Sequence, residues 1–259
     1  GFYLISCLAA FDFGFINLFE LEKRILDSVA TIEKLEKWNG HLYNWYDTVK
    51  AVPLKPSYVS TVDCGNYLCC LTALKEGLKE YGNTDSIFYV TSQRIEKILD
   101  SSDLSVFYDK QRQLFRIGID GEDETVSSSF YDYYMSEARM TSYYAVARRQ
   151  VPSSHWRSLD RTLKRSKSFV TAVSWTGTMF EYFMPVLFLR NVPGSFQYEA
   201  LKVCLYMQKK RAARENIPYG ISESGFFSVD SALNYRYKAH GIKELAAKRN
   251  ADDESVISP

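Results

Sequence analysis

The sequence predicts an all-α fold in which helical hairpins pack side by side, as a bundle or an α/α toroid, with one small β-hairpin insert. Apolar residues recur at helical spacing through most of the chain. The links between the predicted helices alternate between short and long, and we find no internal repeat and no low-complexity tract. Because the long links carry the polar and aromatic residues, we expect a toroid with its site at one end.

The N-terminal part of the chain is expected to be helical apart from one long loop. From Ile16 to Trp38, leucine, isoleucine and valine recur at helical spacing with Glu and Lys between them, which predicts a surface helix with one buried face. A polar and aromatic loop is expected from Asn39 to Asp63, and helices over about residues 64–80 and 84–100. Residues 1–10 are apolar and start abruptly, as expected of a helix cut by the start of the chain.

The segment from Leu104 to Asp120 has a different pattern. Two short β-prone runs, Ser105–Asp109 and Leu114–Ile119, flank the polar link Lys110–Gln113. The link contains no strong turn dipeptide. The two runs nevertheless predict a β-hairpin.

The C-terminal part is expected to return to helices. A serine cluster precedes an apolar helical pattern, which predicts a helix from Ser128 to Arg149 that ends before Pro152. A short amphipathic piece is expected from His155 to Leu163. Pro185 is expected to kink or shorten the helix that contains it. The remaining predicted helices cover about residues 177–190, 195–215 and 229–240.

Composition excludes several classes of protein. A length of 259 residues suffices for one large domain with a full core. A net charge of +1 argues against a nucleic-acid surface, which needs a concentrated basic excess. We find no signal peptide and no apolar run of membrane-spanning length.

The cysteines and histidines indicate a reducing compartment and no metal site. Five cysteines make an odd count without a disulfide spacing. Cys64, Cys69 and Cys70 have neither a nearby histidine nor a CxxC motif, so we expect them to pack as small apolar residues. The three histidines are too scattered for a metal cluster, and no cofactor is expected.

Two runs of small polar, glycine and aromatic residues each lead into a glutamate. Ser174–Tyr182 contains Glu181, and Pro218–Ser224 contains Glu223. Aromatic faces can stack on pyranose rings while paired carboxyls do acid/base work, so the runs are typical of a sugar-processing cleft. The alternative for each glutamate, with equal weight, is a helix-terminal carboxylate favoured by the macrodipole.

A third carboxylate, Glu137, lies within the predicted helix from Ser128. Tyr133 and Tyr134 precede it by four and three residues, so both rings would flank it on one helix face. Partial desolvation there would raise the pKa of Glu137 and suit a general acid. The alternatives are a surface glutamate or a structural ion pair with an arginine; Arg139 itself points elsewhere on such a helix.

Two N-terminal loops offer stacking rings and hydrogen-bonding groups. One contains Tyr43 and Trp45, and the other contains Asp63. The alternative for the first loop is packing of its rings into the core. Asp63 could equally cap the helix that follows it, as could Ser60 or Thr61.

Five stretches of this sequence resemble a known family. They look like the glycoamylase-like domain of cyclic β-1,2-glucan synthases, and related motifs occur in endo-β-1,2-glucanases. The resemblance covers nearly the whole chain in the same order. The stretches are His41–Asp47 (HLYNWYD), Tyr58–Asp63 (YVSTVD), Ser136–Arg139 (SEAR), Ser174–Glu181 (SWTGTMFE) and Gly220–Ser224 (GISES).

The resemblance implies an (α/α)6 toroid that acts on β-1,2-glucan by transglycosylation, which cyclises the chain, or by hydrolysis. Residues 1–259 would form a single glycoamylase-like domain, truncated at both ends, so the ring would be incomplete. In the synthases this domain lies between a membrane-embedded glycosyltransferase and a phosphorylase-like domain. The expected location is the cytoplasmic side, as a soluble domain of an inner-membrane-associated enzyme.

The resemblance also assigns candidate site residues. Glu137 and Glu223 would be the catalytic pair, with Glu137 as acid/base and Glu223 as nucleophile. A carboxyl separation of about 5–5.5 Å would favour retention of configuration, and about 6.5–9.5 Å would favour inversion. Two other classes remain open: a non-catalytic glucan-binding module, and a structural helical domain that positions its neighbours. The residues expected to bind substrate are Tyr43, Trp45, Asp63, Tyr133, Trp175, Glu181 and Tyr219.

Overall fold

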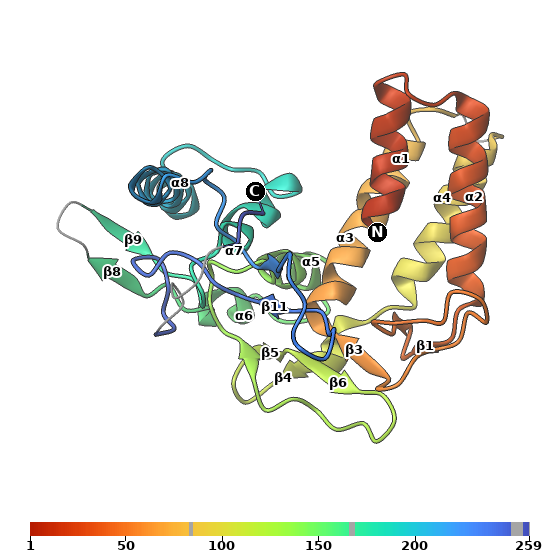
Figure 1. Cartoon of the computed structure of the whole chain (residues 1–259). Coiled ribbons are helices and arrows are strands. Elements are labelled where there is room, and N and C mark those ends of the chain that lie inside the picture. Colours follow the sequence, from red (N-terminus) through yellow and green to blue (C-terminus); the bar gives the residue numbers. More distant parts are fainter. Residues whose placement is uncertain (83–84, 166–168, 250–255, 259) are drawn as a thin grey trace. The chain divides into compact units, whose positions relative to one another are not determined.

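The computed structural model describes residues 1–82, 85–165, 169–249 and 256–258. The chain forms two compact units (Figure 1). The first unit consists of Gly1–Phe130 and Thr141–Trp156, and the second of Tyr131–Met140 and Arg157–Pro259. The chain therefore enters the second unit briefly, returns to the first, and then completes the second.

Four helices dominate the first unit. Helix α1 packs on α2 and α3, and α4 also packs on α2 and α3 (Figure 1). Helix α2 begins with a capping box, in which the Asn17 side chain accepts from the Glu20 amide and Glu20 accepts from the Asn17 amide. The predicted helices are confirmed, although the expected start at Thr84 lies outside the described residues. The bounds are α1 (Phe2–Asp12), α2 (Leu18–Lys34), α3 (Thr61–Leu78) and α4 (Ile87–Asp100).

The core of the first unit lies between these helices. Leucines at three- and four-residue spacing along α3 are fully buried, because this helix contacts both α1 and α4. Residues of the periodic apolar face of α2 also belong to this core. Removing these side chains from water is the main favourable term in folding the unit. The buried residues include Leu21, Ile25, Val29, Leu68, Leu71, Leu74, Leu78 and Ile95.

The strands of the first unit are two or three residues long. The predicted hairpin is confirmed: β4 pairs antiparallel with β5, with Tyr108 opposite Phe115. The two ends of the predicted hairpin differ from the prediction. Residues 104–107 form a 3-10 helix, and β6 pairs with β3. The strands are β1 (Lys37–Trp38), β2 (His41–Leu42), β3 (Tyr58–Ser60), β4 (Tyr108–Asp109), β5 (Leu114–Arg116), β6 (Gly118–Asp120) and β7 (Phe130–Tyr131).

The predicted helix from Ser128 to Arg149 is wrong in its first half, since α5 covers only Arg139–Ala147. Before α5, the amide of Tyr134 donates to the Asp160 carbonyl at 2.9 Å, and Asp160 donates to the Asp132 carbonyl at 2.6 Å. These bonds to a distant segment hold the backbone extended and remove the groups that a helix needs. The piece expected from His155 to Leu163 is also shorter, as helix α6 covers Ser154–Ser158.

The second unit contains a long helix, α8 (Phe196–Glu215), and shorter elements around it. The helix predicted over 177–190 appears as α7 (Met179–Phe183) and the 3-10 helix η2 (Met184–Leu187), and Pro185 lies at the start of η2. This confirms that Pro185 shortens the α-helix. The core includes Met135, Ala172, Tyr182, Leu201, Cys204 and Ile221. The strands are β8 (Leu163–Arg165), β9 (Val170–Ala172), β10 (Ser224–Gly225) and β11 (Tyr237–Lys238).

The helix predicted over residues 229–240 is wrong. The Asp230 carboxylate accepts from the Ala232 and Asn234 amides at 2.8 and 2.9 Å, and Leu233 has a φ of +62°. A side chain that binds nearby amides offers the backbone an alternative to the helix. The segment forms a loop that leads into β11, which pairs with β10 (Figure 1).

Helices are the longest elements of both units, and the described strands form four two-stranded sheets and one three-stranded sheet. Within the part of the chain that the structure describes, no helix combines the length and the apolar composition needed to cross a membrane.

Candidate active site

Glu181 lies in the first turn of α7, where the preceding loop holds its carboxylate. Only 5% of the residue is exposed. The hydroxyls of Ser174, Thr176 and Thr178 donate to Oε2 at 2.9, 2.7 and 2.8 Å. The amides of Thr176 and Thr178 donate at 3.0 and 2.9 Å. Thr178 also accepts from the Glu181 amide, which completes a capping box.

These bonds indicate what Glu181 does. A carboxylate has about four lone-pair sites; four of these donors converge on Oε2, and the Thr176 amide donates to Oε1. Glu181 therefore holds the loop in place, and of the two interpretations offered by the sequence, a helix-terminal carboxylate describes its position. Gly177 in this loop has a φ of +74°, and a Cβ there would lie 2.5 Å from the Ile242 carbonyl oxygen. A direct role for Glu181 in a sugar subsite stays a prediction.

The segment that carries Glu223 is held from two sides. From α8, the Gln208 amide donates to the Ile221 carbonyl at 2.9 Å and accepts from the Ile221 amide at 2.8 Å. From α7, the Met179 amide donates to the Ile221 carbonyl and the Phe180 amide donates to the Ser222 hydroxyl, both at 3.0 Å. Glu223 is therefore not a helix-terminal residue; it follows an anchored stretch of extended chain.

Glu137 lies in a turn immediately before α5, and the prediction of a mid-helix position is wrong. The Ser136 hydroxyl donates to Glu137 Oε2 at 3.1 Å and accepts from the Ala138 amide at 3.2 Å. Burial, followed by the charges of Glu181 and Glu223, raises the pKa of Glu137 to about 8. The predicted rise in the pKa of Glu137 is therefore confirmed, although Glu137 lies in a turn and not in a helix.

Arg139 stabilises the turn without pairing with Glu137. It is 1% exposed, and its Nη1 donates to the Tyr134 carbonyl at 3.2 Å. Its guanidinium lies 5.1 Å from the centre of the Tyr134 ring, which also contacts the Arg161 guanidinium at 4.4 Å. The contacts of the Tyr134 ring with Arg139 and Arg161 stabilise the turn that contains Glu137. The hydrogen bond from Arg139 to the Tyr134 carbonyl also stabilises it.

Glu223 and Glu137 differ in their hydrogen-bond donors. Burial and the charge of Glu181 raise the pKa of Glu223, whereas a hydrogen bond from Tyr237 lowers it. The Tyr237 hydroxyl has its own pKa raised by burial and by the charge of Glu223, so it stays protonated and remains a donor. Both carboxyls thus have a raised pKa, and the large rise for Glu137, to about 8, gives it the environment of a proton donor.

This arrangement supports acid/base chemistry on a neutral ligand. Glu137, Glu181 and Glu223 all belong to the second unit, and they lie close enough that their charges shift the pKa values. A carboxyl with a pKa near 8 is mostly protonated at neutral pH and can donate its proton to a leaving group. A nearby carboxylate can act as nucleophile or base.

Two aromatic side chains of the second unit form a partly exposed pair. Trp175 is 54% exposed, and its ring centre lies 6.1 Å from that of Tyr133. Trp175 follows Ser174 in the loop that Glu181 holds. Tyr219, which is also exposed, contacts the Lys209 ammonium at 5.5 Å from its ring centre. Exposed rings on an ordered loop are suited to stacking on a ligand.

Three of the expected substrate-binding residues belong to the first unit. Tyr43 packs against the core and contacts Tyr46, whereas Trp45 is exposed. Ser60, not Asp63, is the N-cap of α3. The Asp63 carboxylate accepts from the Asn44 side chain at 3.2 Å. The second unit contains the other expected residues: Tyr133, Glu137, Trp175, Glu181, Tyr219 and Glu223.

The sequence interpretation missed Tyr237 and Gln208. Tyr237 lies in the segment predicted to be a helix, so its strand pairing was not anticipated. Gln208 is a polar residue on a helix rich in Lys and Arg, and nothing in the sequence indicates that it is fully buried. The SES motif at residues 222–224 marks Glu223 but not the groups that hold it.

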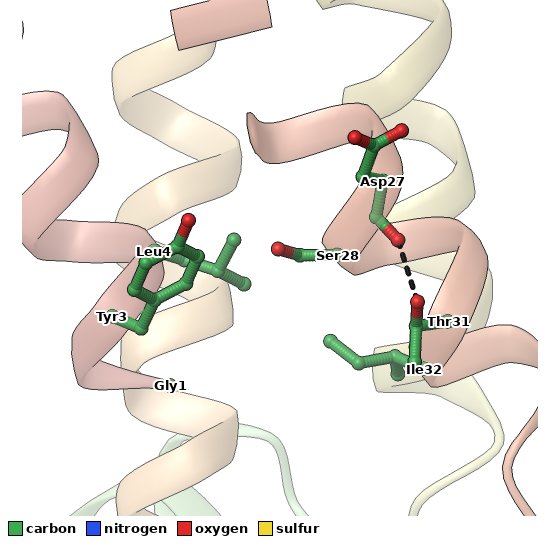
Figure 2. A pocket seen from close by; sticks show the side chains of 7 residues that line it. All are labelled: Gly1, Tyr3, Leu4, Asp27, Ser28, Thr31 and Ile32. Atoms are coloured by element: carbon green, nitrogen blue, oxygen red, sulfur yellow. Dashed lines mark hydrogen bonds between the residues drawn. The ribbon is translucent and has the colours of Figure 1, made fainter. Parts of the chain in front are cut away.

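Among the described residues, these carboxylates belong neither to a metal-binding group nor to the lining of the cavity between α1 and α2. The described residues contain no group of three His, Cys, Asp or Glu side chains placed to hold a metal ion. A cavity of about 310 Å³ lies in the first unit between α1 and α2 (Figure 2). In it, the Thr31 hydroxyl donates to the Asp27 carbonyl at 2.8 Å. The cavity is lined by Gly1, Tyr3, Leu4, Asp27, Ser28, Thr31 and Ile32.

No family model matches the chain. The cyclic β-(1,2)-glucan synthase NdvB of Rhizobium meliloti (strain 1021) is 24% identical over 381 aligned positions. The alignment covers 100% of this chain but 14% of NdvB. This homology confirms the resemblance to cyclic β-1,2-glucan synthases that the motifs indicated.

Solved structures show the same fold. An endo-β-1,2-glucanase from Chitinophaga pinensis, in complex with sophorotriose and glucose, matches with a TM-score of 0.73 at 12% identity. The match covers 94% of this chain and 63% of that one. A glucoamylase-like protein from Bacteroides caccae also matches with a TM-score of 0.73, at 15% identity, over 95% of this chain and 64% of that one. The chain shares the helical fold of these proteins and spans less than two thirds of their length.

Proposed function

We propose that this chain is a carbohydrate-active domain that acts on β-1,2-glucan, with Glu137 as acid/base and Glu223 as nucleophile. The observation that carries the proposal is that two neighbouring carboxyls both have a raised pKa, and that the rise is large for Glu137. The pKa of Glu137 is raised to about 8, whereas for Glu223 the Tyr237 hydroxyl opposes the effects of burial and of Glu181. The homology to NdvB and the fold shared with an endo-β-1,2-glucanase support the choice of substrate.

The proposed reaction begins when Glu137 donates its proton to the glycosidic oxygen. The Glu223 carboxylate attacks the anomeric carbon, the bond to the leaving oxygen breaks, and a glycosyl-enzyme ester forms. The Glu137 carboxylate then removes a proton from an incoming hydroxyl, which attacks the same carbon and releases Glu223. A hydroxyl of the glucan itself completes transglycosylation, and the reaction is cyclisation when that hydroxyl belongs to the bound chain. Attack by water gives hydrolysis.

Trp175 and Tyr133 are proposed to stack on a sugar ring beside these carboxyls. Tyr219 is proposed to add a further contact, and Glu181 to support the subsite by holding the loop of Trp175. Tyr43, Trp45 and Asp63 are proposed to line further sugar subsites. Trp45 is exposed and Asp63 keeps its carboxylate near the start of α3, which suits contact with a polysaccharide.

The two units are proposed to belong to one domain, an (α/α)6 toroid of which residues 1–259 supply a part. The longer chains of the matching structures support this reading. NdvB is several times longer than this chain, and we propose that the domain lies beside glycosyltransferase and phosphorylase-like domains on the cytoplasmic face of the inner membrane.

The proposal is tested by incubating the chain with linear β-1,2-glucan and analysing the products. The wild type is expected to give cyclic glucan, redistributed chain lengths or shorter chains. Glu137→Gln and Glu223→Gln are each expected to reduce the rate about 10³-fold or more, because each removes a group from the chemical step. Glu199→Gln is a matched control, since Glu199 is a solvent-exposed residue of α8 paired with Lys202.

A glucan-binding module without catalysis is the second candidate, favoured by the exposed Trp175 and Tyr133 pair. It predicts that the glucan binds with unchanged chain length and that neither glutamine variant has any effect. The configuration of the first product, followed by NMR, separates retention from inversion. Immediate inversion would exclude Glu223 as a nucleophile and make it the base that activates water.

A further inference from the structure

We propose that Tyr237 is the positioning residue of Glu223, whose carboxylate its hydroxyl orients for attack; this inference rests on the function proposed above. Neither the motifs nor the relatives point to Tyr237. It lies 14 residues beyond Glu223 in the sequence, on the far strand of the hairpin formed by β10 and β11. The strand register brings the two side chains together.

The register accounts for the contact. Ser224 pairs with Lys238, and Gly225 pairs with Tyr237. Glu223 lies in the bend immediately before β10, two residues from Gly225, whose strand partner is Tyr237. The pairing therefore brings Tyr237 beside the backbone that carries Glu223, at a separation that long side chains span. A hydrogen bond joins the Tyr237 hydroxyl to the Glu223 carboxylate.

The hairpin is held on both strands. The Phe226 amide donates to the Arg236 carbonyl at 2.9 Å, which extends the pairing beyond β10. The Arg236 guanidinium lies 4.6 Å from the centre of the Phe226 ring, whose other contact is the His240 ring at 5.6 Å. These contacts fix the strand that carries Tyr237 relative to the strand that follows Glu223.

Gly225 leaves room for the hairpin's second tyrosine. A Cβ at this position would overlap the ring and hydroxyl of Tyr235. Tyr235 is 71% exposed and covers the glycine backbone, whereas the Tyr237 hydroxyl binds Glu223. The two tyrosines thus differ in one respect that an experiment can use: the hydrogen bond to the Glu223 carboxylate comes from Tyr237.

The charges around Tyr237 give its hydroxyl a defined task. Its neighbours from the packed elements are Glu223, Glu137 and Tyr235, and the Glu181 charge acts on Glu223 from α7. Burial and Glu181 favour the protonated form of Glu223, which cannot attack a sugar carbon. A donor bound to the carboxylate opposes both effects. Tyr237 therefore keeps Glu223 ionised over a wider pH range while Glu137 retains its proton.

The test is the pH profile of kcat/KM for Tyr237→Phe on linear β-1,2-glucan. Removing the hydroxyl raises the pKa of Glu223, so the acidic limb of the profile is expected to move to higher pH by about one unit. On the acidic limb, kcat/KM at a given pH is expected to fall by up to about tenfold, mainly through kcat. Tyr235→Phe removes a hydroxyl from the same hairpin and is expected to leave the acidic limb in place.

The outcomes separate this inference from the function on which it rests. If the wild type is inactive, or Glu223→Gln retains full activity, the proposed function fails. If the wild type is active, Glu223→Gln is inactive and Tyr237→Phe keeps the wild-type acidic limb, the positioning role alone is overturned. The thermal midpoint of each variant is measured in parallel. An equal loss of activity at every pH, accompanied by a lower midpoint, would mean that Tyr237 is only structural.

Discussion

Gln208 and Ile221 are joined by two hydrogen bonds, in which one buried amide side chain satisfies both the N–H and the C=O of a single residue. The distances are 2.8 Å from the Ile221 amide and 2.9 Å to its carbonyl. This pairing ties the middle of α8 to the stretch of chain that precedes Glu223. The position of a candidate catalytic carboxyl thus depends on a glutamine that touches no ligand.

Replacing Gln208 by Leu is expected to destabilise the protein by about 1–3 kcal/mol, because the buried Ile221 amide loses its acceptor, whereas the Ile221 carbonyl still accepts from the Met179 amide. Unfolding in urea measures the change. Gln197→Leu is the matched control on the same helix, since the Nε2 of Gln197 has no partner among the described residues. Its loss should be well below 1 kcal/mol. Equal losses for the two variants would contradict the role given to Gln208.

Glu181→Gln is expected to lower stability by about 2–4 kcal/mol, because an amide nitrogen would then face hydroxyl and amide donors. The loop of Ser174 to Thr178 would lose its common acceptor. The thermal midpoint measures the effect, with Glu199→Gln as the exposed control. A Glu181→Gln variant that keeps its midpoint and loses only substrate binding would show that the carboxylate acts on the ligand.

Activity is expected to fall as the pH rises through about 8, the pKa of Glu137. The acid form donates the proton in the first step, and this form is lost above the pKa. The basic limb of kcat/KM, which reports the free enzyme, measures it. Because the Ser136 hydroxyl lowers the pKa of Glu137, Ser136→Ala is expected to move the basic limb to higher pH, and a move to lower pH would contradict this assignment.

The same group has a consequence for stability. The pKa of Glu137 is higher in the folded chain than its ordinary value of about 4.5, so the folded state binds the additional proton between about pH 4.5 and 8. Stability from this group therefore declines as the pH rises through that window. Glu137→Gln should unfold at a higher temperature than the wild type at pH 8, and the difference should shrink toward pH 4.5. A constant difference at all pH values would contradict this linkage.

Trp175→Ala is expected to weaken glucan binding by about 1 kcal/mol, roughly fivefold, with little loss of stability, because the exposed ring contributes area to a ligand rather than to the core. Calorimetric titration with β-1,2-glucan oligosaccharides measures the affinity. Tyr206→Ala, an exposed aromatic residue of α8, is the control. Unchanged binding by Trp175→Ala would remove this ring from the proposed subsite.

The sequence predicted elements well where one local signal dominates. The apolar period of α2 and α8, the effect of Pro185 and the two runs around β4 and β5 all produced structure near the expected residues. Each depends on neighbours within a few positions of the chain. The segment before α5 was mispredicted because the backbone of residues 132–134 binds Asp160, a partner that helical spacing does not reveal.

For the site, the sequence by itself determined the chemical groups and the family resemblance: glutamates set among aromatic and small polar residues in recognisable motifs. Only the tertiary structure decided how those glutamates differ. Five donors surround Glu181, burial protonates Glu137, and a strand pairing brings the Tyr237 hydroxyl to Glu223. A pKa and a hydrogen-bond partner depend on atoms that fold in from distant positions, and local sequence patterns carry no record of them.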